Sequence, residues 1–171
     1  MYARATARWN AVRPSAFIAK SEVRGWPFIG WLSARHDTIF LRRGSHGHAR
    51  DINAEIEALL HVGRDVALFP EGKTSNGEAV DTFHGNMLQA AIVATCPVQA
   101  VALDYRLAAT GARSTAVSYA SPLNFAQSLI NTLASGPYVA RLQFAPSLPT
   151  QGRNRKHLAE QLRQQIVQMR A

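Results

Sequence analysis

Short apolar segments alternate along this chain with segments of helical periodicity. Strands are expected at residues 15–20, 38–41, 65–69, 98–105, 115–119 and 138–144. Helices are expected at residues 52–62, 86–95, 123–134 and 154–169. Because strands and helices that alternate in sequence usually form a sheet covered by helices, the pattern predicts an α/β fold with a largely parallel mixed sheet flanked by helices.

Helix ends can also be placed from single residues. Asp51 is expected to cap the helix at 52–62, because its carboxylate can accept a backbone N–H of the first turn. Gly63 stands where that helix should stop. Ser21 can cap a further helix after the first strand, which Pro27 would start or kink.

The composition favours one domain and anionic partners. The chain has 171 residues, 47% of them apolar, and no linker long enough to divide it, so we expect a single domain over 1–171. Lys and Arg number 19 against 11 Asp and Glu, a net charge of +8. Such an excess suits nucleic acid, an acidic membrane surface or a phosphate-bearing substrate. With one cysteine, Cys96, the chain can form no internal disulfide.

The segment with the strongest indication of a functional site is 69–75, which reads Phe-Pro-Glu-Gly-Lys-Thr-Ser. An expected buried strand ends here in a proline, a carboxylate, a glycine and hydroxyls. Ligands of α/β proteins bind at such strand ends, and glycine lets backbone N–H groups approach an anion. The alternative is a tight turn whose carboxylate is merely solvated.

Three further segments accompany it in a particular order. Residues 38–43 read Thr-Ile-Phe-Leu-Arg-Arg, residues 82–86 read Thr-Phe-His-Gly-Asn, and residues 96–103 read Cys-Pro-Val-Gln-Ala-Val-Ala-Leu. Together with 69–75 and the approach at 13–27, they resemble the glycerolipid acyltransferase family, which includes bacterial 1-acyl-sn-glycerol-3-phosphate acyltransferases. The resemblance extends from residue 10 to residue 106 and implies a glycerol-3-phosphate acyltransferase-like fold.

The resemblance implies a site for the acyl acceptor. The residues it assigns there are Arg42, Arg43, Glu71, Gly72, Thr74 and Ser75. Arginine binds phosphate through two parallel hydrogen bonds, so Arg43 would hold an acceptor phosphate. We therefore expect Arg43 and the turn at Glu71 to meet at one rim of the sheet. Pro97 and Val98 would support the acyl chain, or simply pack in the core.

The chain departs from the family at its first motif, a His and an Asp separated by four residues. The resemblance implies that this His is the general base and that the Asp orients it, and a positioned base typically contributes about 10²–10⁴-fold. Residues 1–9, where the motif should lie, contain neither, so the chain looks truncated at its N-terminus. His46 and Asp51 have the right spacing but follow the second motif. His84, close to 69–75, is the other candidate base, or an ordinary polar residue near a helix start.

Three functions are therefore open. The first is an acyltransferase that uses acyl-CoA or acyl carrier protein as donor, without cofactor or metal, and acts on a lysophospholipid of the 1-acylglycerol-3-phosphate type. A lyso-ornithine lipid is an alternative acceptor. The second is an inactive relative that binds lipid or phosphate. The third, a nucleic-acid-binding domain, is disfavoured because the basic residues are scattered and form no recognised motif.

A membrane surface is the expected location. Residues 23–32 hold aromatic and aliphatic side chains between Arg24 and Arg35, which suits the lipid headgroup region, although these side chains could equally pack in the core. The longest apolar run, 90–103, is too short to span a bilayer. We expect peripheral attachment to the cytoplasmic face of an anionic membrane.

Overall fold

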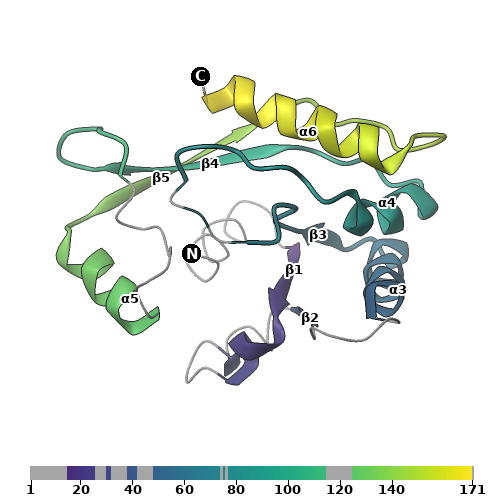
Figure 1. The fold of residues 1–171 in the computed structure, drawn as a ribbon, viewed down its shortest axis with the longest axis horizontal. Helices are drawn as coiled ribbons and strands as arrows, with labels where there is room; N and C mark the ends of the chain where they lie inside the picture. The colour runs from purple at the N-terminus through teal and green to yellow at the C-terminus, as the bar shows by residue number, and fades with distance from the viewer. Residues whose placement is uncertain are drawn as a thin grey trace.

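The computed structural model describes residues 15–25, 30–31, 38–41, 48–73, 75, 77–114 and 125–170 (Figure 1). The described strands are β1 (Ser15–Lys20), β2 (Ile39–Leu41), β3 (Asp65–Ala67), β4 (Val101–Leu107) and β5 (Tyr138–Phe144). The described helices are the 3-10 helices η1 (Ser21–Gly25) and η2 (Gly85–Leu88) and the α-helices α3 (His48–His61), α4 (Gln89–Val93), α5 (Phe125–Ala134) and α6 (Arg155–Arg170). The expected α/β class is confirmed, and the strand expected at 115–119 lies outside the described residues.

β1 is the central strand of a parallel sheet with the order β2-β1-β3. Phe17 pairs with Ala67 on one side, and Lys20 pairs with Leu41 on the other. Four apolar residues of β1 are buried, as a strand covered on both faces requires: Ala16, Phe17, Ile18 and Ala19. Because the three strands are parallel, β2 and β3 end at the same end of the sheet.

α3 packs against β2 and β3 and against the short helix α4. Ile52 and Ile56 are buried on its inner face, as the helical periodicity predicts. The prediction that Asp51 caps this helix is wrong, because α3 begins at His48 and Asp51 lies exposed within its first turn. Ala49 and Arg50 are good helix formers that extend the helix backward past the acid. The stop at Gly63 is confirmed by its positive φ of 76°.

β4 and β5 form a second, antiparallel sheet in which Val101 pairs with Phe144 and Leu107 with Tyr138. The described strands therefore divide into a parallel set and an antiparallel pair. Figure 1 shows α6, in yellow, lying along this pair. Leu158 and Leu162 of α6 are buried in a core cluster that also contains Phe83 of the loop before η2.

Four expected elements are shorter or differently built. β4 begins at Val101 rather than at residue 98, because only an isolated bridge joins Val98 to Leu148. The helix expected at 86–95 is η2 followed by α4 and ends at Val93. The helix expected after Ser21 begins as the 3-10 helix η1, and its continuation near Pro27 lies largely outside the described residues. β3, expected at 65–69, ends at Ala67, so Leu68 and Phe69 lead from the strand into the turn of the candidate site.

Candidate functional site

The turn after β3 is the centre of the candidate site. Pro70 and Gly72 occupy the second and fourth positions of a β-turn, where these residue types are favoured. The N–H of Gly72 donates to the carbonyl of Phe69 at 3.2 Å and closes the turn. Gly72 has a φ of +65°, a conformation that costs other residues about 1–2 kcal/mol.

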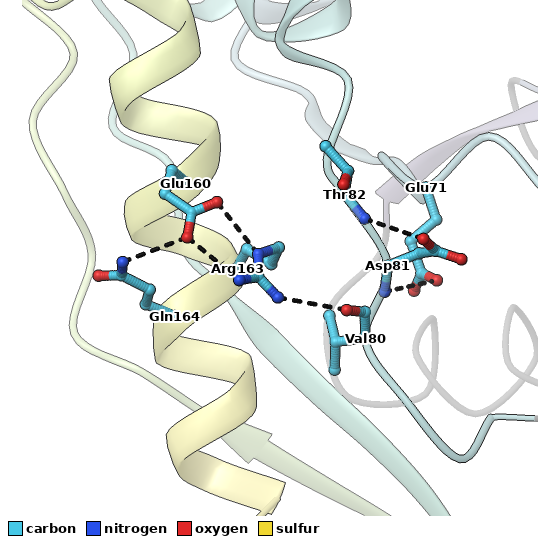
Figure 2. A network of polar contacts seen from close by, with 7 residues as sticks. All are labelled: Glu71, Val80, Asp81, Thr82, Glu160, Arg163 and Gln164. Atoms are coloured by element: carbon cyan, nitrogen blue, oxygen red, sulfur yellow. Dashed lines mark hydrogen bonds and ion pairs between the residues drawn. The ribbon is translucent and has the colours of Figure 1, made fainter.

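The Glu71 carboxylate is half-buried and has a backbone partner. The N–H of Asp81 donates to its Oε2 at 3.3 Å (Figure 2). Burial is the largest influence and raises the pKa of the Glu71 carboxyl, while the bond from the Asp81 N–H and the charge of Lys73 act in the opposite direction. A carboxyl of this kind can accept or release a proton closer to neutral pH than an exposed glutamate.

Asp81, next to Glu71, is held in its ionised form. Nζ of Lys73 lies 2.7 Å from Oδ2 of Asp81, and the N–H of Thr82 donates to its Oδ1 at 3.3 Å. The hydrogen bond from Lys73 is the main cause that lowers the pKa of the Asp81 carboxyl. Two neighbouring carboxyl groups therefore have pKa values shifted in opposite directions, an arrangement that is enriched at functional sites.

His84 lies beside the same turn. Its backbone N–H donates to the carbonyl of Pro70 at 2.8 Å, and a Cβ atom added to Gly72 would lie 3.4 Å from its Cδ2. The imidazole is exposed and makes no capping bond to η2, which it precedes. The His84 imidazole therefore lies exposed beside Gly72.

The structure brings together only part of the residue set that the sequence suggests. Glu71, Gly72 and His84 meet at the turn, whereas the Ser75 hydroxyl accepts the Gly77 N–H at 3.2 Å and serves the loop. Asp51 lies on α3. Four further candidates lie outside the described residues, so their meeting with the turn stays a prediction: Arg42, Arg43, His46 and Thr74.

Sequence reasoning did not find the groups that hold this loop from α6. Nη1 of Arg163 donates to the carbonyl of Val80 at 3.3 Å, and Arg163 is itself paired with Glu160 (Figure 2). In sequence, Glu160 and Arg163 are only a common i,i+3 pair on a helix. The contact of Arg163 with Val80, 83 residues earlier in the chain, has no local signal.

A cavity of about 720 Å³ adjoins the turn. Its lining is largely apolar, with Phe17, Leu103 and Ile166 among the residues, and Glu71 and Lys73 are among the charged residues that also line it. Pro97 and Val98 also line it, and Val98 packs against the core as well. The cavity therefore places an apolar space next to a polar turn, which is what an amphipathic ligand requires.

Two negative observations apply to the described part of the chain. No three His, Cys, Asp or Glu side chains there are placed to hold a metal ion. No described helix combines the length and the apolar character needed to cross a bilayer. Of the apolar residues expected at a membrane surface, Trp31 is described and is 54% exposed, while Trp26, Phe28, Ile29 and Leu32 lie outside the described ranges.

Comparison with known proteins shows which protein family this chain resembles. The Acyltransferase family model matches residues 2–104. A lyso-ornithine lipid O-acyltransferase of Pseudomonas aeruginosa is 37% identical over 157 residues, which are 92% of this chain and 60% of that protein. A 1-acyl-sn-glycerol-3-phosphate acyltransferase of Neisseria gonorrhoeae is 40% identical over 111 residues, 65% of this chain and 43% of that protein.

A solved structure has the same fold. It is the 1-acyl-sn-glycerophosphate (LPA) acyltransferase PlsC of Thermotoga maritima, with a TM-score of 0.56 and 20% identity, covering 92% of this chain and 58% of that one. At this identity the likeness concerns the fold alone. The chain spans less than two thirds of the length of each of these three proteins.

Proposed function

This chain belongs to the acyltransferase family, and on that basis we propose that it transfers a fatty acyl group from an acyl thioester to the free hydroxyl of a lysolipid. The hydroxyl oxygen attacks the thioester carbonyl carbon, the C–S bond breaks, and an ester forms. The hydroxyl proton passes to a base and leaves with the thiol. Coenzyme A or acyl carrier protein carries the acyl group, and no cofactor takes part.

The observation that carries this proposal is the position of the Glu71 turn between a sheet edge and an apolar cavity. A lysolipid has a polar head and an apolar chain. Its head would lie at Glu71 and Gly72, where the missing side chain of Gly72 exposes the backbone. Its chain, or that of the donor, would lie along the apolar walls that include Phe17 and Ile166.

Two acceptor headgroups are candidates. A 1-acylglycerol-3-phosphate would use Arg42 and Arg43 for its phosphate, as the family resemblance implies. A lyso-ornithine lipid, which carries an amine in its headgroup, is favoured by two observations. The relative that covers 92% of this chain bears that name, and the polar side chain at the turn is a carboxylate, Glu71.

His84 is the candidate base among the described residues. Its imidazole is exposed beside Gly72. Deprotonation by His84 would let the acceptor hydroxyl attack the thioester. The alternative is that this chain binds a lysolipid or a phosphate without turnover, in which case no variant of His84 changes a reaction rate.

The acceptor is a membrane lipid, so we also propose peripheral contact with an anionic bilayer at its cytoplasmic face. The net charge of +8 favours such a surface, and each basic residue close to it contributes about 1 kcal/mol. Co-sedimentation with vesicles of phosphatidylglycerol, but not of phosphatidylcholine, is the expected result. Equal recovery in the two pellets would contradict a charge-driven contact.

The direct test is an acyl-transfer assay with the purified chain. Labelled acyl-CoA or acyl carrier protein is offered with lysophosphatidate in one arm and lyso-ornithine lipid in the other. His84→Ala should lower kcat about 10²-fold or more, the usual contribution of a positioned base. As a control, His157→Ala removes an exposed histidine that lies on α6 and should leave kcat unchanged.

The possible outcomes separate the proposals. Loss of turnover in His46→Ala with full activity in His84→Ala would move the base to His46. Absence of turnover with both acceptors would refute acyl transfer by this chain. Calorimetric titration of lysolipid into the inactive protein would then show whether the binding alternative holds.

A further inference from the structure

We propose that Arg163 of α6 is a positioning residue for Glu71, and that it acts through the peptide group between Val80 and Asp81. The expected effect of Arg163 on substrate kinetics rests on the proposed function, because Glu71 belongs to the proposed acceptor site. The expected effect of Arg163 on the orientation of the Asp81 N–H does not depend on that function. α6 also lies beyond residues 2–104, the part of the chain that carries the family match.

One peptide group connects the two side chains. Its carbonyl oxygen, from Val80, accepts a hydrogen bond from Nη1 of Arg163 at 3.3 Å. Its N–H, from Asp81, donates to Oε2 of Glu71 at 3.3 Å. Figure 2 shows Arg163 and Glu71 on the two sides of this segment. A cation at the carbonyl and an anion at the N–H both favour the same orientation of the peptide dipole, so each bond strengthens the other.

Arg163 reaches Val80 in a fixed direction because Glu160 holds its other two nitrogens. Nε of Arg163 lies 3.0 Å from Oε2 of Glu160, and Nη2 lies 3.2 Å from Oε1. This paired contact leaves Nη1 for the loop, which a planar guanidinium allows and a lysine ammonium does not. Gln164 also donates to Oε1 of Glu160, at 3.2 Å, and makes this contact with Glu160 alone among the members of the network.

The cluster is too exposed to act mainly through stability. The side chains of Arg163 and Glu160 are 30% and 46% exposed, and ion pairs of that kind contribute little to folding. Their geometry matters more, because the same loop is held at a second point. The carbonyl of Gly77 accepts hydrogen bonds from Arg113 and from Arg170 of α6. α6 thus contacts the loop on both sides of Glu78 and Ala79.

Loss of Arg163 would leave the Val80–Asp81 peptide free to rotate, and the Asp81 N–H would no longer point steadily at Glu71. The Glu71 carboxylate would then sample several orientations. Substrate binding should suffer before folding does, because the core contacts of α6 are made by other residues, Leu158 and Leu162. This order of effects distinguishes a positioning role from a structural one.

Amide hydrogen exchange of the substrate-free protein gives the first test. Arg163→Met and Arg163→Lys should each speed exchange of the Asp81 amide about tenfold, the effect of losing a hydrogen bond to a charged group. The amides of Leu158 and Leu162 should keep their rates. Gln164→Ala is the matched control, since it removes a partner of Glu160 without touching the loop, and it should leave the Asp81 amide unchanged.

Steady-state kinetics give the second test. Arg163→Lys should raise the KM for the lysolipid about tenfold and alter kcat less. An unchanged Asp81 exchange rate in both Arg163 variants would overturn the inference, as would equal acceleration of all amides in α6. Acceleration confined to Asp81 in a protein without turnover would support the positioning role while the proposed function failed.

Discussion

A Cβ atom at Gly72 would lie 3.4 Å from Cδ2 of His84, so the glycine of the turn and the histidine ahead of η2 are direct neighbours. The chain makes an excursion between them and returns, and the His84 N–H closes it by donating to the Pro70 carbonyl at 2.8 Å. This closure places the His84 imidazole beside Gly72, the residue that follows Glu71 in the turn.

Gly72→Ala tests how the turn at Gly72 contributes to stability and to lysolipid binding. The positive φ of 65° should cost about 1–2 kcal/mol in the free energy of unfolding, measured by urea titration. Gly152→Ala is the matched control, because Gly152 has a φ of 69° and nothing lies within 4 Å of the added atom. Both variants should lose similar stability, and only Gly72→Ala should weaken lysolipid binding. Equal binding by the two would show that the turn does not face the ligand.

Lys73→Met should shift two pKa values upward. Asp81 loses the hydrogen bond that is the main cause of its lowered pKa, and Glu71 loses a nearby positive charge that lowers its own. Carboxyl-carbon NMR titration measures both groups separately. Lys156→Met, which removes the same charge from the first turn of α6, should move neither.

The same pair predicts a pH dependence of stability. Because the folded-state pKa of Asp81 is lowered, its contact with Lys73 stabilises the protein above the unfolded pKa of 3.8. This contribution is lost as the pH falls through the lowered folded-state value. The stability difference between the wild-type protein and Lys73→Met should therefore be larger at neutral pH than in strong acid. A difference that does not change with pH would show that the ion pair is not formed in solution.

Gly85→Ala should be destabilising for a steric reason. An added Cβ would lie 2.7 Å from the carbonyl oxygen of Arg155, the first residue of α6, so η2 and α6 would have to separate. Overpacking of this kind costs about 1–3 kcal/mol. Gly25→Ala, with nothing within 4 Å of the added atom, should change stability by less than about 0.5 kcal/mol. Thermal unfolding of both variants compares them, and equal midpoints would contradict the close approach.

Thr150→Val should reveal a buried hydroxyl that joins two distant segments. Thr150 is 1% exposed, and its Oγ1 lies 3.2 Å from the carbonyl oxygen of Ala91 and 3.0 Å from that of Cys96. Replacing the hydroxyl with a methyl group leaves those carbonyls without this donor and should cost about 1–3 kcal/mol. Thr150→Ser keeps the hydroxyl and should cost less. If Thr150→Ser had a lower free energy of unfolding than Thr150→Val, packing of the methyl group would contribute more to stability than the hydrogen bonds.

The elements that could be predicted are those whose signals are local. The strand at 138–144 and the helix that begins near 154 depend on apolar periodicity within the segment itself, and both predictions are confirmed. The failure at Asp51 has a local cause as well, since a good cap residue can also lie inside a first turn.

The elements that could not be predicted depend on distant partners. A regular strand does not begin at residue 98, because Val98 pairs with Leu148 in an isolated bridge that is one residue out of step with the pairing of Val101 and Phe144. Instead, the Gln99 side chain donates to the Ala145 carbonyl at 2.8 Å. The direction in which β4 and β5 pair is likewise invisible in either segment alone.

The candidate site divides in the same way. Glu71, Gly72 and His84 could be chosen in advance because they stand in a recognisable order of residue types. Asp81 and Arg163 could not, since their roles come from a backbone N–H and a backbone carbonyl that any sequence provides. Arg43 and its meeting with the turn remain a prediction for the part of the chain that the structure does not describe.

α6 packs its leucines into the core and extends its arginines to the loop that carries Val80. A fragment that ends with β4 would keep most residues of the recognisable motifs but lose both the core contacts of α6 and its hydrogen bonds to the loop. Anyone who transplants the motif segment into another scaffold, or compares chains by that segment alone, therefore has to bring the last helix along with it.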